Sequence, residues 1–377
     1  MKILYVIGSF YPSQGGGPSS AISWLVKFVH RQGVDTKVVT TNSEISPDRN
    51  IIPNIWIKNE FGQVCYHSFR SMQLPVRMTF SALWQLRNTD IVHLNSIFHP
   101  PSLIVAAIAL MMRKVIFWDP GGELASEALK YGSLKKHIYL KLVRFIVRDK
   151  PYYHTTSKQE TEDVKKNINP NARFFEAPNY IDSIDRISCE PKKQFLFLGR
   201  FHPIKGIENL LIAIGLSEKF MNSDFSLVIA GDHQNDYGAY IKGLVDDLHL
   251  GSKVKFVGHV QDTQKFTLFA ESYFFILPSH SENFANVVTE SLSQGTPVIA
   301  STGTPWKILE DNKSGYYCSN QPEILARAID QALNLDVESY NKFRTNAFAL
   351  VIDHFGMEKG VHKWIDAYRD ALSVALK

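Results

Sequence analysis

Short apolar segments alternate with helix-length amphipathic segments along most of this 377-residue chain. Each apolar segment has the length of a buried strand, and the segments between them are long enough to form helices. Strands and helices that alternate in this way form βαβ units, in which the strands run parallel and helices cover the sheet. The sequence therefore predicts an α/β protein with doubly wound, Rossmann-like parallel sheets. The predicted strands are 2–7, 35–40, 90–94, 115–118, 153–156, 195–198, 225–230, 253–257, 274–277 and 297–301. The predicted helices are 19–32, 101–112, 207–216, 237–248 and 356–377. A further helix is predicted to begin near 159, capped by Ser157.

The length of the chain exceeds what one hydrophobic core usually supports, so two domains are expected. The polar segment 181–193 separates two series of strands and predicts the hinge between them. We therefore expect a domain at 1–185, a domain at 186–355 and a final helix at 356–377. Open parallel sheets bind ligands beyond the carboxyl ends of their strands. The two sheets are expected to face a central cleft, and the loops that follow strands are the candidate binding loops.

The overall composition is that of an ordinary globular protein, with 45% hydrophobic residues and a formal net charge of +4. Three cysteines, far apart in the sequence, indicate a reducing compartment and neither a disulfide framework nor a metal site. The apolar segment 3–7 is too short for a secretory signal, and the run 103–112 is about half the length of a membrane-spanning helix. These features predict a cytoplasmic protein.

The segment between Lys130 and Lys150 is strongly basic and has helical periodicity. Such a helix can lie on an anionic membrane. Alternatively, its apolar residues pack on the domain core and leave a basic face in water. The second interpretation is favoured over insertion, with weak electrostatic attraction to anionic lipid at the inner face of the cytoplasmic membrane. The apolar positions at helical spacing are Leu134, Ile138, Leu142, Phe145 and Ile146, among the basic residues Lys135, Lys136, Lys141, Arg144 and Arg148.

The loop after strand 2–7 contains Gly15, Gly16 and Gly17 immediately before a helix. Consecutive glycines allow positive φ and place backbone amides where a diphosphate or a sugar can approach. The loop matches neither the GxGxxG nor the P-loop spacing. Its position at the end of a strand favours a binding role over that of a merely flexible loop.

The loop after strand 195–198 carries two cations, Arg200 and Lys205, between Gly199 and Gly206. Their charges suit a diphosphate leaving group and would stabilise the negative charge that develops on it. The other interpretation is a solvated basic turn. The position of the loop at the predicted cleft favours the first.

Glu282 and Glu290 belong to a strand–loop–helix segment after strand 274–277. The free amides at a helix start form an anion site, and two acids beside it indicate a ligand with both phosphate and hydroxyl groups. Considered alone, the two glutamates are more often solvated surface groups.

Polar residues also follow two strands of the first series. His93, Asn95 and His99 follow or end the strand at 90–94, and Asp119 and Glu123 follow the strand at 115–118. These side chains can contact sugar hydroxyls on the acceptor side or take part in proton transfer. Equally, the histidines can be structural, and the carboxylates can cap the helix that follows.

Taken together, these motifs resemble the family 4 glycosyltransferases, which have the GT-B fold. The resemblance covers nearly the whole chain and is strongest over 195–317. It is carried by a Gly-Arg…Lys-Gly loop at 199–206, a Glu-x7-Glu motif at 282–290, Gly-Thr-Pro-Val-Ile-Ala at 295–300 and Gly-Tyr-Tyr at 315–317. In the first domain, the loop 12–17 and the segment 90–93 are also similar to family features.

The resemblance implies a role for each matching residue. Arg200 and Lys205 would hold the donor diphosphate, Glu282 would lie near the sugar hydroxyls, and Glu290 would bind the ribose. The amides of Asn283, Phe284 and Ala285 would lie near sugar and phosphate, Gly15 to Gly17 would approach the diphosphate from the other domain, and Gly199, Gly231, His259, Asn286 and Val287 would complete the donor site. The resemblance also implies transfer with retention, no bound metal or other cofactor, and a final helix that crosses back to the first domain.

The sequence departs from the family pattern at two places. The family loop after the first glutamate commonly reads Gly-Phe-Gly, and here it reads Asn283-Phe284-Ala285. Many members have a histidine where this chain has Asn95. Since an amide cannot exchange a proton near neutral pH, this difference argues against a catalytic histidine there.

The sequence therefore predicts a retaining, metal-independent hexosyltransferase. It would move a sugar from a nucleotide-sugar, preferentially a UDP-sugar, to a saccharide or lipid-linked saccharide in exopolysaccharide, capsule or O-antigen-type biosynthesis. A guanine nucleotide is also compatible with the sequence, because the base would be held largely by the backbone near Gly258 and His259. Two alternatives stay open: a nucleotide-sugar epimerase on the same fold, and a non-catalytic nucleotide-sugar-binding partner. No nucleic-acid partner is expected.

Overall fold

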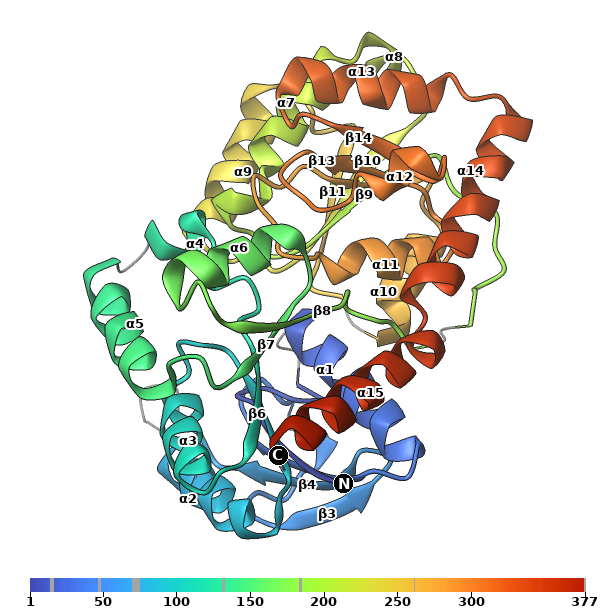
Figure 1. The fold of residues 1–377 in the computed structure, drawn as a ribbon. Helices are drawn as coiled ribbons and strands as arrows, with labels where there is room; N and C mark the ends of the chain where they lie inside the picture. Colours follow the sequence, from blue (N-terminus) through green and yellow to red (C-terminus); the bar gives the residue numbers. More distant parts are fainter. Residues whose placement is uncertain are drawn as a thin grey trace. The chain divides into compact units, whose positions relative to one another are not determined.

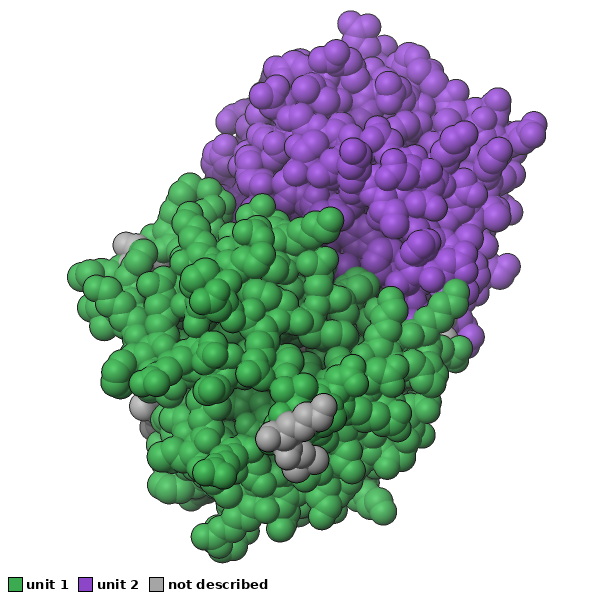
Figure 2. All heavy atoms as spheres, viewed as in Figure 1, with its two compact units in different colours: residues 1–182, 357–377 green, residues 183–356 purple. Residues whose placement is uncertain are grey.

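The computed structural model describes residues 1–13, 17–46, 49–69, 75–130, 133–182, 185–260 and 262–375. It divides into two compact units. Unit 1 comprises residues 1–182 together with 357–377, and unit 2 comprises residues 183–356 (Figures 1 and 2). Each unit is an α/β structure with its own sheet.

The sheet of unit 1 has the strand order β3-β4-β2-β1-β5-β6-β7-β8. All neighbouring strands are parallel except β3 and β4, which form an antiparallel hairpin at the edge. The sequence-based prediction of a wholly parallel sheet missed this hairpin. The strands are β1 (Lys2–Val6), β2 (Asp35–Thr41), β3 (Trp56–Asn59), β4 (Gly62–His67), β5 (Ile91–Asn95), β6 (Val115–Asp119), β7 (Tyr152–Thr155) and β8 (Arg173–Glu176).

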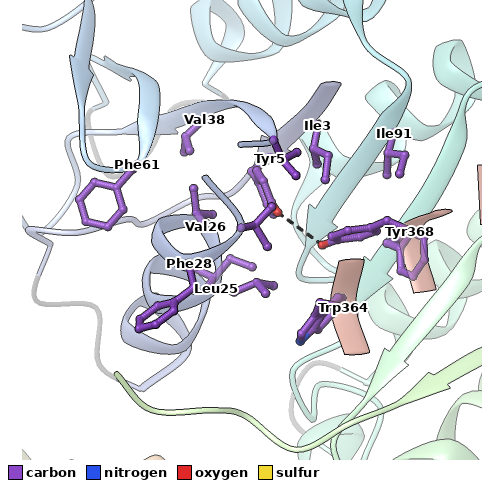
Figure 3. Packing of buried hydrophobic residues seen from close by; sticks show 14 of the residues in the cluster. Ile3, Tyr5, Leu25, Val26, Phe28, Val38, Phe61, Ile91, Trp364 and Tyr368 are labelled. Atoms are coloured by element: carbon purple, nitrogen blue, oxygen red, sulfur yellow. Dashed lines mark hydrogen bonds between the residues drawn. The ribbon is translucent and has the colours of Figure 1, made fainter. Parts of the chain in front are cut away.

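Alternate residues of β1 enter two separate hydrophobic clusters, one on each face of this sheet. Ile3 and Tyr5 pack with α1 (Gly17–Arg31) and α15 (Met357–Ala375), as Figure 3 shows. Leu4 and Val6 pack in the cluster that contains α2 (Val76–Gln85), α3 (Pro100–Met111) and α5 (Ser133–Val147). This alternation is the two-residue period of a strand buried on both faces. The structure also describes in unit 1 the helical segments η2 (Leu86–Asn88), α4 (Ser126–Lys130) and α6 (Lys158–Asn167).

The sheet of unit 2 is parallel throughout and has the order β11-β10-β9-β12-β13-β14. Counted along the chain this is the doubly wound order 3-2-1-4-5-6, and the core of the unit 1 sheet, β4-β2-β1-β5-β6-β7, has the same order. The strands are β9 (Gln194–Leu198), β10 (Ser226–Ala230), β11 (Val254–Gly258), β12 (Phe274–Leu277), β13 (Val298–Ser301) and β14 (Gly315–Cys318). The helices are η3 (Pro203–Lys205), α7 (Ile207–Leu216), α8 (Glu218–Met221), α9 (Asp236–Asp247), α10 (Asp262–Ala270), α11 (Asn286–Ser293), α12 (Ile308–Asp311), α13 (Pro322–Leu333), α14 (Val337–Leu350) and η4 (Val351–Phe355).

The strand order fixes where ligand-binding loops lie in each unit. Neighbouring strands whose connections leave in opposite directions open a crevice at their carboxyl ends. In unit 1 these strands are β1 and β5, and in unit 2 they are β9 and β12. Among the described residues, no helix combines the length and the apolar character that crossing a bilayer requires.

Candidate donor and acceptor sites

The loops after β9 and β12 pack directly on each other at the switch point of unit 2. The backbone amide of His280 donates to the carbonyl of Ile204 over 2.8 Å. Gly206 has a φ of +62°, and a Cβ there would lie 2.4 Å from the carbonyl oxygen of Pro278. Glycine at this position is therefore required both by the backbone conformation and by the close approach of the two loops.

This packing brings Lys205 and Glu282 together. Lys205 Nζ lies 2.5 Å from Glu282 Oε1, and the same oxygen accepts a hydrogen bond from Ser279 Oγ over 2.6 Å. The Glu282 amide donates to the carbonyl of Gly303 over 2.9 Å, so a third loop, the one after β13, also holds this residue. The side chains of Lys205 and Glu282 are 14% and 12% exposed. Both groups are thus held in place and still reachable from solvent.

Arg200 adds a second positive charge to the loop after β9. Its side chain is exposed. The pKa of His202, between the two cations in sequence, is lowered by burial and further by the charges of Arg200 and Lys205. Two cations whose fields act on one loop favour the binding of an anion such as a diphosphate.

Glycines end three neighbouring strands of this sheet. A Cβ on Gly231, after β10, would lie 2.1 Å from the carbonyl oxygen of Gly199, after β9. The Gly231 amide donates to the carbonyl of Gly258, at the end of β11, over 2.7 Å. The predicted donor residues Gly199 and Gly231 therefore lie side by side, and the exposed His259 follows directly after Gly258.

The start of α11 has no side-chain cap. Ala285, the N-cap residue, provides no side-chain acceptor for the first amides of the helix, and its carbonyl accepts a hydrogen bond from the Val288 amide over 2.9 Å. Asn286 is buried, and Val287 is half-buried in the first turn. Ala285 has a φ of 66° and a ψ of 74°, a left-handed conformation that favours glycine.

The side chain of Phe284 faces the core of unit 2. It is 6% exposed, and its ring centroid lies 5.1 Å from that of Trp306 and 5.8 Å from that of Phe355. Its carbonyl accepts a hydrogen bond from Trp306 Nε1. Phe284 therefore has only its backbone amide to offer a ligand, which is the group that the prediction assigned.

Glu290 is more buried than its predicted role in ribose binding implies. It is 2% exposed, and its Oε1 accepts a hydrogen bond from Lys265 Nζ, in α10, over 2.6 Å. The sequence reasoning missed Lys265, because nothing in the local pattern of α10 indicates which residue of α11 it meets. A ribose at Glu290 would have to share this carboxylate with Lys265 or displace the lysine.

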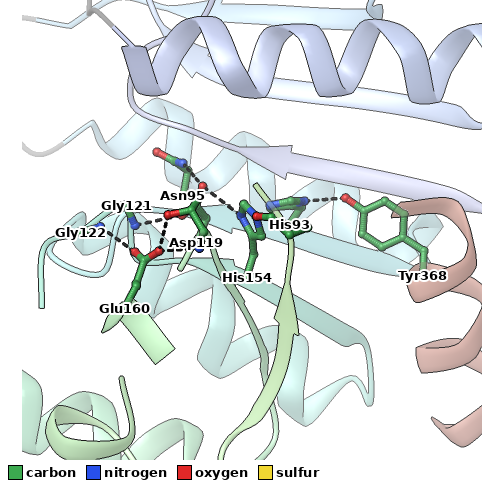
Figure 4. A network of polar contacts seen from close by, with 10 residues as sticks. His93, Asn95, Asp119, Gly121, Gly122, His154, Glu160 and Tyr368 are labelled. Atoms are coloured by element: carbon green, nitrogen blue, oxygen red, sulfur yellow. Dashed lines mark hydrogen bonds and ion pairs between the residues drawn. The ribbon is translucent and has the colours of Figure 1, made fainter. Parts of the chain in front are cut away.

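His93, in unit 1, is a structural residue and not a surface group. It is 1% exposed, and its ring stacks on that of Tyr5 with 5.1 Å between the ring centroids. Its Nδ1 lies 2.7 Å from the hydroxyl of Tyr368 (Figure 4). Burial lowers the pKa of His93 to about 3, so the ring is neutral. Of the two roles predicted for His93, this burial fits the structural one, because packing between the sheet and α15 removes the ring from solvent.

Asp119 joins a buried network that the sequence reasoning did not foresee. Its Oδ2 lies 3.6 Å from Nδ1 of His154 and accepts a hydrogen bond from Asn95 Nδ2 over 3.3 Å (Figure 4). The other ring nitrogen of His154 lies 2.9 Å from the carbonyl oxygen of Ala177. Burial alone would lower the pKa of His154, but the nearby carboxylate of Asp119 outweighs this effect and raises that pKa. The contact favours the charged form of both groups.

Glu160 completes this network from the first turn of α6. It accepts hydrogen bonds from the amides of Gly122 and Thr156 over 2.7 and 2.8 Å. Burial, and next the charge of Asp119, raise the pKa of Glu160. The predicted cap residue Ser157 is confirmed, since its Oγ accepts from the Glu160 amide over 3.2 Å.

Glu123 and His99 hold the loop after β5. Glu123 accepts hydrogen bonds from Ser96 Oγ and from the amides of Ile97 and Phe98 over 2.6, 2.7 and 3.1 Å. The expectation that Glu123 contacts the acceptor does not fit a carboxylate already used by this loop. His99 is half-buried and lies near the end of β1, since a Cβ on Gly8 would be 3.6 Å from its Nε2.

Of the predicted acceptor-side residues, Asn95, His99 and Asp119 thus remain near the carboxyl edge of the unit 1 sheet. A pocket of about 20 Å³ lies there, lined among others by Asp119, His154, Tyr180 and Trp364. Its volume suffices for about one water molecule. Gly17 begins α1, whereas Gly15 and Gly16 lie outside the described residues.

The chain is similar to known glycosyltransferases in sequence and in fold. Residues 183–350 match the family model of glycosyl transferases group 1. A GDP-mannose:cellobiosyl-diphosphopolyprenol alpha-mannosyltransferase of Xanthomonas oryzae pv. oryzae is 22% identical over 99% of this chain and 98% of its own length. A mannosyltransferase of the same name from Komagataeibacter xylinus is 20% identical over 100% of this chain and 95% of its own length.

Solved structures show the same fold. HepE of Anabaena, in complex with UDP and glucose, has a TM-score of 0.78 at 16% identity and matches 98% of this chain and 100% of its own. The sucrose-phosphate synthase of Thermosynechococcus elongatus has a TM-score of 0.77 at 17% identity and matches 99% of this chain and 100% of its own. The predicted GT-B fold is confirmed, and the family match over 183–350 together with the full-length relatives supports a glycosyltransferase.

Proposed function

We propose that this protein is a retaining hexosyltransferase of family 4 that transfers a sugar from a nucleoside-diphosphate sugar to a saccharide or lipid-linked saccharide. The observation that carries the proposal is the cluster at the β9–β12 switch point. There Arg200, the Lys205–Glu282 pair and the uncapped start of α11 come from adjacent loops. Cations and helix amides meet the diphosphate, and Glu282 and Glu290 meet the hydroxyls of sugar and ribose.

Charge stabilisation is the main contribution of this site to the reaction. As the bond between the sugar and the phosphate breaks, negative charge grows on the diphosphate. Arg200, Lys205 and the amides of α11 stabilise it without reorganisation. The leaving phosphate accepts the proton of the acceptor hydroxyl on the same face, so the configuration at the sugar is retained. In this scheme the two cations take the place of a metal ion, and transfer should persist in a chelator.

Two donors are the first to be tested. A UDP-sugar is the donor predicted from the sequence, and HepE was solved with UDP and glucose. GDP-mannose is named for the full-length relatives, whose acceptor is a cellobiosyl-diphosphopolyprenol. These names support a lipid-linked saccharide acceptor. We further propose a role in bacterial polysaccharide synthesis at the cytoplasmic face of the membrane. Nucleotides that bind the folded protein will raise its melting temperature.

The decisive measurement is turnover of the Lys205→Ala variant with the donor so identified. We expect kcat to fall roughly a hundredfold, the scale for a lost charge stabiliser. Lys192→Ala is a matched control, because it removes another Lys–Glu pair, of 2.6 Å to Glu271. That control should keep normal turnover. Near-normal turnover of a folded Lys205→Ala variant would refute the assigned role of this loop.

A further inference from the structure

The helix α5 has two apolar faces, and the sequence-based interpretation assigned the wrong one to the core. Leu140, Val143 and Val147 are the buried residues that meet the sheet cluster. Of the five apolar residues that were expected to pack inward, Ile146 does pack against this cluster. The other four lie within an arc of about 80° on the opposite side, since each residue advances about 100° around a helix. These outward residues are Leu134, Ile138, Leu142 and Phe145, and they are 47% to 75% exposed.

The helix α2 repeats this arrangement. Met78 and Ala82 are buried toward the sheet. Val76, Phe80 and Trp84 follow one another at intervals of four residues on the outer side, and they are 54%, 68% and 68% exposed. Large apolar side chains at this level of exposure, repeated at helical spacing, are unusual for a surface that faces only water.

The two outer stripes belong to one surface of unit 1. Both helices lie on the same face of the sheet, and α3 packs between them, in contact with each. Figure 1 shows α2 and α3 adjacent, with α5 next to α3. Ile104 and Met111 of α3 are also exposed, at 46% and 72%. We call the outer side chains of α2, α3 and α5 the three-helix surface.

The charge of the three-helix surface has a single sign. The helices α2, α3 and α5 contain no aspartate or glutamate. By contrast, the exposed side of α9 carries Asp236, Asp246 and Asp247. The exposed basic residues within these helices are Arg77, Lys135, Lys141 and Arg144. Arg87, Arg113 and Arg148 lie just beyond the helix ends, where Asp90 and Asp149 also lie.

From these observations we propose that the three-helix surface docks on an anionic lipid bilayer, with Trp84, Phe80, Ile138 and Phe145 inserted at the headgroup boundary. An apolar stripe bordered by cations and free of acids matches the acyl and headgroup layers of such a membrane. Arg87 lies over the ring of Trp84 at 5.1 Å, so an aromatic anchor and a cation stand together at the edge of the surface. The inference is independent of the proposed enzyme activity.

Vesicle binding of the full chain tests the proposal without any activity assay. The protein is sedimented with vesicles of phosphatidylglycerol and phosphatidylcholine, and with vesicles of phosphatidylcholine alone. We expect at least tenfold stronger binding to the anionic vesicles, weakened as salt rises. Equal binding to both vesicle types, or no binding to either, would overturn the proposal.

Paired variants separate apolar insertion from charge. Ile138→Ser/Phe145→Ser and Phe80→Ser/Trp84→Ser should each weaken binding roughly tenfold or more, given the apolar area withdrawn from lipid. Val337→Ser/Tyr240→Ser removes side chains that are 77% and 55% exposed in unit 2 and should bind like the wild type. Lys141→Glu/Arg148→Glu should abolish the preference for anionic lipid, whereas Lys242→Glu/Lys342→Glu should leave it intact. Wild-type binding by the first two variants would refute the surface.

A depth measurement tests insertion itself. Brominated lipid should quench the fluorescence of the wild type in bound vesicles and quench Trp84→Phe distinctly less, because phenylalanine retains the anchor but not the signal. Identical quenching of the two proteins would show that Trp84 stays in water and would overturn the proposal. So would a lipid-free change of oligomeric state in Ile138→Ser/Phe145→Ser, because it would identify a second copy of the chain as the occupant.

Discussion

Ala285 holds a side chain where the backbone favours glycine. Its left-handed φ of 66° costs a residue with a Cβ about 1–2 kcal/mol. As the N-cap of α11, it also offers the first amides of the helix no side-chain acceptor of its own. The backbone strain and the missing cap both lie at the turn that we propose faces the donor. Strained residues of this kind persist where the surrounding structure holds them in place.

Ala285→Gly should therefore stabilise unit 2. Relief of the left-handed strain outweighs the extra freedom of glycine in the unfolded chain, and the net gain should be up to about 1 kcal/mol. Ala349→Gly, at an exposed position inside α14, is the matched control and should destabilise by about 1 kcal/mol. Denaturant unfolding measures both. A loss of stability in Ala285→Gly would mean that Ala285 is not strained.

His93 should make the folded protein sensitive to acid. An unfolded histidine titrates near pH 6.5, whereas burial lowers the pKa of His93 to about 3 in the fold. Between these values the unfolded state binds a proton that the folded state does not, so the free energy of unfolding falls as pH drops below 6.5.

His93→Phe, which keeps a ring but cannot titrate, should lose less stability between about pH 6.5 and 4 than the wild type. Melting temperatures across this pH range decide the matter. Parallel wild-type and His93→Phe curves would contradict the prediction. His99 stays in both proteins and adds its own acid sensitivity, since burial lowers its pKa to about 4.

At the scale of elements, apolar periodicity predicted most strands and helices, and long-range packing decided the rest. The predicted helix 207–216 coincides with α7, and Ser157 caps α6 as expected. The topological rule for parallel sheets also located the loops after β9 and β12. Periodicity does not reveal which of two apolar stripes on α5 meets the sheet, nor that Lys265 of α10 meets Glu290 of α11. Those contacts depend on residues distant in sequence.

Gly360 shows how one element depends on close contact with another. It lies inside α15, where glycine normally costs about 1 kcal/mol relative to alanine. A Cβ at Gly360, however, would lie 2.3 Å from the ring of Tyr180, which is buried in the same cluster as α15. The absence of a side chain therefore lets the helix seat on this ring.

Gly360→Ala should destabilise the protein by roughly 1–3 kcal/mol, the cost of overpacking a core. Gly243→Ala, inside α9, meets no atom within 4 Å and should instead stabilise by about 1 kcal/mol. The same Gly→Ala substitution is thus expected to lower the free energy of unfolding in α15 and to raise it in α9. Chemical denaturation measures both changes. Two changes of the same sign would show that helix propensity, and not the contact with Tyr180, governs Gly360.

On the scale of the whole molecule, unit 1 is built from two distant parts of the sequence. The chain leaves unit 1 at 182, forms unit 2, and returns at 357 to add α15 to the first unit. The Met357 amide donates to the carbonyl of Ile181 over 2.9 Å. The segment where the chain leaves unit 1 is therefore hydrogen-bonded to the segment where it returns. Trp364 and Tyr368 then fill the cluster on one face of the first sheet (Figure 3). The last helix, α15, therefore completes the hydrophobic core of unit 1.

Removal of residues 357–377 should accordingly unfold or loosen unit 1 and leave unit 2 intact. Trp364 and Tyr368 are 2% and 0% exposed, and loss of one large buried aromatic side chain alone costs about 3–5 kcal/mol. Hydrogen exchange, resolved by peptide, should rise in β1, β5, β6 and α1, while β9, β10 and β12 keep their protection. A chain that lacks only 374–377, where Val374 is 53% exposed, should match the full-length protein. Equal loss of protection in both sheets would contradict this prediction, because it would show that α15 supports the two units alike.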